Sequence, residues 1–96
     1  MKIPQIFKIG NYIIYFWSNE TIPLEPIHVH VHVALGVPSE NATKIWITQT
    51  GKCLLANNDS KIPNKQLKYI IDIIEARSDE IKNKLESYFH QIIFYC

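Results

Sequence analysis

The chain is poor in the residues that mark disulfide-linked or membrane-spanning proteins. Its 96 residues include two cysteines, Cys53 and Cys96, which form no CxxC pair. A small secreted domain normally needs several disulfides, so we expect two reduced thiols in a cytoplasmic protein. No apolar run approaches the roughly 20 residues that cross a bilayer. The first residues also lack the apolar stretch of a signal peptide.

An excess of charge of one sign is missing as well. Ten basic residues face nine acidic ones, and the formal net charge is +1, with no run of like charge. Proteins that read DNA sequence cluster Lys and Arg against phosphates, so the composition argues against that class. A small anionic ligand needs only one or two positive groups and stays compatible with the sequence. The three glycines are isolated, and no glycine-rich phosphate loop is present.

The residues that are present predict one domain, residues 1–96, with a strand-rich first half. Hydrophobic residues make up 47% of the chain, enough for a single core. Thr50 and Gly51 favour a hairpin turn. Four segments are rich in β-branched or aromatic residues, as strands are: residues 11–18, 27–35, 43–48 and 52–56.

The second half has the pattern of helices. Pro63 suits the first turn of a helix, and Ser78, followed by Asp79 and Glu80, is typical of an N-cap with acids in the first turn. Apolar residues at helical spacing form two stripes: Leu67, Ile70, Ile71 and Ile74, then Ile81, Leu85, Tyr88, Phe89, Ile92 and Ile93. We therefore predict an α+β fold, with an antiparallel sheet of three to four strands (about 11–56) and two C-terminal helices (about 63–94) on one face.

The segment EPIHVHVHV, Glu25 to Val33, places three histidines at alternate positions. In an extended strand His28, His30 and His32 share one face and the valines share the other. Valines are the natural core side beneath the helices. This arrangement predicts that the histidines lie on the open face of the sheet.

This histidine strand has three readings. Alternate Cα atoms lie about 6.8 Å apart, so His28 and His30 could share a zinc or manganese ion, with a third ligand from Glu25, Glu20, His32 or His90. The same face could instead contact a nucleotide, RNA or a protein. It could also be a polar outer surface with no ligand. His32 is the weakest metal ligand, and His90, beside Phe89, is typical of a helix surface.

Other candidates carry less weight. Tyr15 and Trp46 could stack on bases, although large aromatic residues in a small domain mostly pack in the core. Cys53 lies within KCLLA, the setting of a structural thiol. Arg77 is the one arginine, and its position favours a charge at a helix end.

The order of motifs resembles a known family. YFWSNE, a proline-bearing loop, EPIHVHV, KIWI, LANN and two C-terminal helices are similar to the small prokaryotic family called domain of unknown function 4160. Its hallmark, a proline, one residue and then His-x-His, falls on Pro26, His28 and His30, whereas His32 lies outside it. The likeness runs from about Phe7 to Cys96. It implies a compact cytosolic α+β domain, often in gene pairs resembling toxin–antitoxin modules, with no established activity.

These observations predict a small non-enzymatic binding module of a toxin–antitoxin-like or phage–host conflict system. We expect His28, His30, Trp46 and Tyr15 to contact a nucleotide, RNA or a protein partner, and a homodimer through an open sheet edge is compatible with this. The alternative is a metal-dependent hydrolase of the phosphodiesterase or nuclease type, with His28, His30 and Glu25 at the metal. A third reading is docking to a protein through the helices alone.

Overall fold

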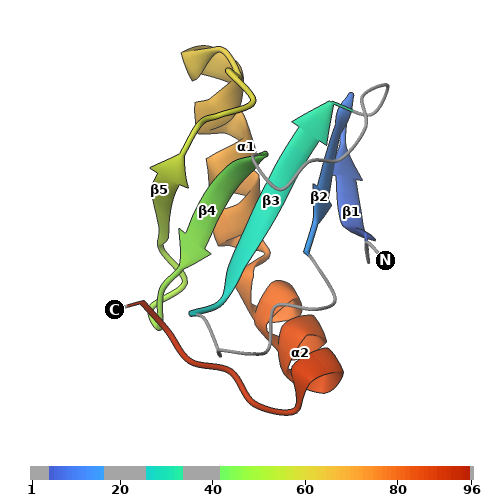
Figure 1. The fold of residues 1–96 in the computed structure, drawn as a ribbon, viewed down its shortest axis with the longest axis vertical. Coiled ribbons are helices and arrows are strands. Elements are labelled where there is room, and N and C mark those ends of the chain that lie inside the picture. The colour runs from blue at the N-terminus through green and yellow to red at the C-terminus, as the bar shows by residue number, and fades with distance from the viewer. Residues whose placement is uncertain (1–4, 17–25, 34–41, 96) are drawn as a thin grey trace.

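The computed structural model describes residues 5–16, 26–33 and 42–95. Five strands form one antiparallel sheet whose spatial order follows the chain. They are β1 (Gln5–Ile9), β2 (Tyr12–Tyr15), β3 (His28–Val33), β4 (Thr43–Ile47) and β5 (Cys53–Asn57). Two helices follow, α1 (Asn64–Ala76) and α2 (Ser78–Phe89); in Figure 1 α1 passes behind the sheet and α2 extends below the lower ends of β2 and β3.

The predicted α+β class is confirmed, but the predicted three to four strands are wrong, because the sheet has five. The missed strand is β1, which pairs with β2 around a turn at Gly10. Its register shifts between Gln5 and Phe7, so that both Ile6 and Phe7 are buried. A bulge of this kind breaks the alternation by which a half-buried strand is recognised.

The main core fills the space between the sheet and the helices. Both apolar stripes predicted for the helices contribute to it, and the strands contribute alternate residues. Its most deeply buried members are Ile14 from β2, Val29 and Val31 from β3, Ile45 and Ile47 from β4, Ile70 and Ile74 from α1, and Ile81 and Leu85 from α2.

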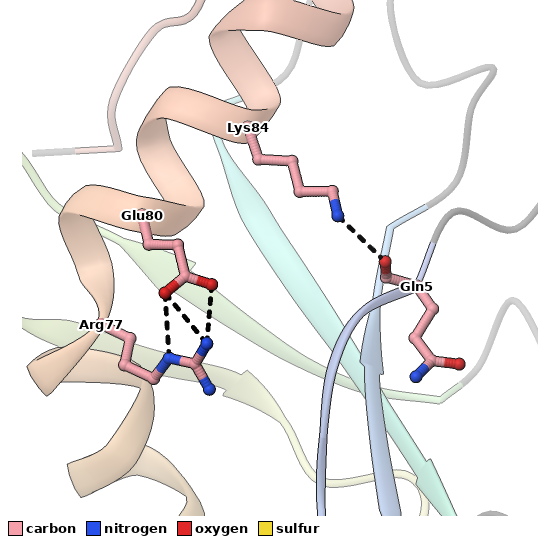
Figure 2. A network of polar contacts seen from close by, with 4 residues as sticks. All are labelled: Gln5, Arg77, Glu80 and Lys84. Atoms are coloured by element: carbon pink, nitrogen blue, oxygen red, sulfur yellow. Dashed lines mark hydrogen bonds and ion pairs between the residues drawn. The ribbon is translucent and has the colours of Figure 1, made fainter.

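Arg77 ties the junction of the two helices to β1. Its guanidinium donates hydrogen bonds to the Glu80 carboxylate at 2.7–3.1 Å and lies 4.0 Å from the centre of the Phe7 ring. One turn further along α2, Lys84 Nζ donates to the backbone carbonyl of Gln5 at 3.3 Å (Figure 2). Arg77 and Lys84 are both exposed. The Arg77–Phe7 and Lys84–Gln5 contacts therefore each stabilise the packing of β1 on α2 only modestly.

Gly51 closes the predicted hairpin between β4 and β5 and packs against the start of α2. Its N–H donates to the Thr48 carbonyl at 3.0 Å, and its φ is +90°. A Cβ at this position would lie 2.7 Å from Ser78 Oγ. Ser78 is the buried first residue of α2, not its N-cap as the sequence suggested, because Arg77 occupies the cap position. Its hydroxyl therefore faces the turn.

We expect Gly51→Ala to lower the free energy of unfolding by about 2 kcal/mol or more, since it adds a clash to the cost of a positive φ. Gly10→Ala is the matched control, because Gly10 has φ +56° with nothing near a Cβ, and should cost about 1 kcal/mol. Urea denaturation measures both. Ser78→Ala should recover part of the loss in the Gly51→Ala background, and equal losses for the two glycines would contradict the contact.

Candidate functional site

Three neighbouring strands bring the histidines together with an aromatic residue on either side. In the register of the sheet Tyr15 lies opposite His30, and His28 lies opposite Trp46. Lys44 is the β4 partner of His30. Cross-strand partners point to the same face, and Val29 and Val31 occupy the helix side. The predicted separation of valines and histidines onto opposite faces is therefore confirmed. We call the face opposite the helices the ring face.

The histidines are nevertheless not open to solvent, and this part of the prediction is wrong. His28, His30 and His32 are 6%, 4% and 8% exposed. Tyr15 beside them is fully buried and forms a second small core with Ala42 and Ile13. Imidazole rings at this depth pack as part of the structure, and a ligand would reach them only at the edges.

The side chains of the ring face form a continuous row of rings. Each ring contacts the next with centroids 5.0–5.5 Å apart, within the range of favourable aromatic pairs. All but two of the pairs are edge-on, the Tyr15–His30 pair being tilted and the Trp46–Tyr95 pair stacked. In order the row is His32, Tyr15, His30, His28, Trp46 and Tyr95.

His28 is held in one orientation by the residue that precedes the strand. Its Nδ1 lies 2.9 Å from the Pro26 carbonyl oxygen. A carbonyl only accepts, so Nδ1–H donates and the lone pair of a neutral ring is on Nε2. This contact gives the Pro-x-His spacing a physical purpose, because it fixes the ring that packs edge-on against Trp46.

Trp46 is the point where the row reaches the surface. It is half-buried, and Lys44 Nζ lies 4.3 Å from the centre of its ring, a cation–π distance. Tyr95 stacks on it with an interplanar angle of 11°. Tyr95 belongs to the segment 90–95 after α2, which we call the strap. The strap leaves the helix layer and passes under the end of the sheet in Figure 1.

One protein-family model covers strands β2 to β5 and most of both helices. The family model described as Domain of unknown function (DUF4160) matches residues 11–86. The chain belongs to this family. The match spans Pro26, His28 and His30 and ends within α2, so that β1 and the strap lie outside it. No curated protein and no solved structure matches the chain.

The strands of this DUF4160 domain have an uneven distribution of charge. Their described residues include Lys8, Lys44 and the three histidines but no carboxylate. Lys8 is the register partner of Ile13 and so shares the ring face. The described carboxylates lie in the loop before α1 and on the helices: Asp59, Asp72, Glu75, Asp79, Glu80 and Glu86. The two lysines of the described strands, Lys8 and Lys44, therefore both lie on the ring face.

A metal ion on this DUF4160 domain would depend on the pair His28 and His30. Within residues 5–16, 26–33 and 42–95, no group of three His, Cys, Asp or Glu residues could hold a metal ion. The predicted third ligands Glu20 and Glu25 lie outside the described residues. His90 caps α2 in a left-handed conformation, is exposed, and joins no such group among the described residues. It is a helix-end residue, as its position suggested.

Sequence reasoning singled out Tyr15 and Trp46 but missed Lys44 and Tyr95. Alternation in KIWI could have placed Lys44 beside Trp46. No local signal could have identified Tyr95, whose stacking partner is 49 residues away in the chain. A cleft of about 340 Å³ lies between the β1–β2 turn and α1, and none of the predicted site residues line it. Its lining is Ile9, Gly10, Asn11, Tyr12, Gln66, Tyr69 and Ile70.

Two further features bear on function. Among the described residues no helix is long and apolar enough to cross a membrane.

Cys53 is partly buried, and burial, helped by the negative charge of Glu75, raises the pKa of its thiol from 9.0 to about 12. The Glu75 carboxylate also accepts a hydrogen bond from the Cys53 backbone N–H at 2.8 Å. A thiol that stays protonated is a poor nucleophile, which supports the structural interpretation of Cys53.

Cys53 should therefore resist alkylation. In a Cys96→Ser variant at pH 8, we expect iodoacetamide to modify the folded protein roughly a thousandfold more slowly than the urea-unfolded chain, in proportion to the thiolate fraction. Glu75→Gln should raise the rate severalfold. Because the folded pKa lies above the unfolded one, stability should also fall as the pH rises from about 9 to about 12. Equal rates in folded and unfolded protein would contradict the shift.

Proposed function

We propose that this DUF4160 domain is a small non-enzymatic binding module whose ring face recognises a nucleotide or single-stranded RNA. The observation that carries the proposal is the row of rings that reaches the surface at half-buried Trp46, with the Lys44 ammonium 4.3 Å from the centre of its ring. Aromatic side chains beside positive charge are the usual means of binding nucleobases and phosphates without reading sequence.

The members of the row have different roles in this proposal. Trp46 makes the direct contact with a base, because it is the accessible ring of β4. His28 supports Trp46 from β3, and His30 connects His28 to Tyr15. Buried rings in contact lose little side-chain freedom when a ligand binds, so the surface ring is preorganised. Loss of either histidine would then weaken binding through the orientation of Trp46.

The cellular setting is proposed from the family resemblance. A module of this size, with a near-neutral charge and one ligand face, suits a regulatory part in a toxin–antitoxin-like or phage–host conflict system. Weak net charge also favours recognition through stacking over general attraction to nucleic acid.

Binding can be measured with adenosine 5′-monophosphate and a ten-nucleotide oligoadenylate. We expect Trp46→Ala to weaken oligonucleotide binding about tenfold or more, the usual consequence of losing one base stack. Lys44→Ala should weaken it less and should reduce its dependence on salt. Fluorescence anisotropy of a labelled oligonucleotide measures both effects, and urea denaturation confirms that each variant is folded.

Lys68→Ala is the matched control, since Lys68 is an exposed lysine of α1 whose Nζ lies 3.8 Å from Asp72 Oδ2. It should bind as the unchanged protein does. Equal affinity of the Trp46→Ala variant, or absence of binding to either probe, would reject the nucleotide and leave a protein as the partner of this face.

A metal-dependent hydrolase of the phosphodiesterase type is the second candidate, favoured by one observation. His28 donates its Nδ1–H to a backbone carbonyl, which is how metal-binding histidines are commonly held. Its ring centroid lies 5.0 Å from that of His30. A zinc or manganese ion on this pair would activate a water molecule for attack on a phosphodiester.

Calorimetric titration of metal-stripped protein with zinc, then manganese, tests the second candidate. Tight binding of about one ion per chain, lost in His28→Ala/His30→Ala and kept in His90→Ala, would favour the hydrolase. We expect no such binding, because the proposed module needs no metal. Nucleotide affinity should accordingly be the same with and without a chelator.

A further inference from the structure

We propose that a nucleobase binds Trp46 in the position that the Tyr95 ring occupies in this structure, so that the strap competes with the ligand within the molecule. This inference rests on the proposed function and specifies which surface of the ring face a base would use. It also gives the strap a regulatory part in binding.

The residues that contact the Trp46 ring come from two kinds of segment, paired strands and the strap. Among the described residues its ring meets His28, Lys44 and Tyr95. His28 and Lys44 belong to the paired strands β3 and β4, so the register of the sheet holds their backbones beside Trp46. Tyr95 belongs to the strap, which is neither helix nor strand. It is therefore the contact that can be exchanged without disturbing the sheet.

The strap can stay attached when the Tyr95 side chain moves. The Ile93 carbonyl accepts a hydrogen bond from the Ile27 N–H at 2.9 Å, and Ile92 and Phe94 pack against the main core. Tyr95 itself is 58% exposed. A change of its side-chain rotamer into solvent would uncover the Trp46 ring and leave these anchors in place.

The spacing of the two rings favours exchange over insertion. Their centroids are 5.2 Å apart at an interplanar angle of 11°. A base inserted between them would need about 7 Å, since each pair of stacked surfaces is separated by about 3.5 Å. A base that takes the place of the tyrosine ring would keep the offset stacking on Trp46.

Removal of the competing ring should therefore strengthen binding. We expect Tyr95→Ala to bind adenosine 5′-monophosphate roughly two- to tenfold more tightly than the unchanged protein, which is the equivalent of one aromatic pair. Tyr95→Phe keeps the ring and should not differ. Tyr69→Ala is the control for loss of an exposed tyrosine, since Tyr69 is 62% exposed on α1 and lies on the helix side of the sheet.

The titrations are made in a Trp17→Phe background, where Trp46 is the sole tryptophan and its fluorescence reports binding directly. Tighter binding by Tyr95→Ala alone supports the exchange. Unchanged or weaker binding by Tyr95→Ala, while Trp46→Ala weakens oligoadenylate binding about tenfold or more, rejects the exchange and keeps the proposed function. No binding of either nucleotide probe by the unchanged protein or by Tyr95→Ala rejects both.

Discussion

The alternation of valine and histidine along β3 is the constraint on which the two faces of the domain depend. Side chains of a strand point to opposite faces with a period of two, so Val29 and Val31 are committed to the core under the helices. His28 and His30 are then committed to the other side. A shift of register by one residue would place imidazoles against α1 and α2, and the apolar core would be lost. Packing on one face thus determines which rings meet on the other.

The ring face is built across strands, and its order depends on the sheet as a whole. Tyr15 comes from β2 and Trp46 from β4, on either side of the histidine strand. The Pro26 carbonyl orients His28, and His28 in turn contacts Trp46. The strap adds a contact from beyond α2: the Trp46 ring is stacked by Tyr95, whose neighbours Ile92 and Phe94 pack against the main core. This connection makes binding at Trp46 sensitive to the strap.

The fold was largely predictable where periodicity was undisturbed. The stripes that include Leu67 and Leu85 identified both helices, and Thr50 with Gly51 identified the hairpin. The strand β1 was missed because its bulge buries two consecutive residues, Ile6 and Phe7. Ser78 was misplaced as an N-cap, because local composition does not show that the Gly51 turn packs against its hydroxyl.

The sequence by itself determined that three histidines share one face of a strand and that valines oppose them, because this follows from the geometry of any extended chain. It also contained the segment, residues 11–86, that the family model matches. Tertiary structure alone decided that these histidines are buried, that Trp46 is where their row of rings reaches the surface, and that Tyr95 stacks there. Burial and long-range contacts depend on segments that meet only after folding, so a local sequence pattern does not predict either.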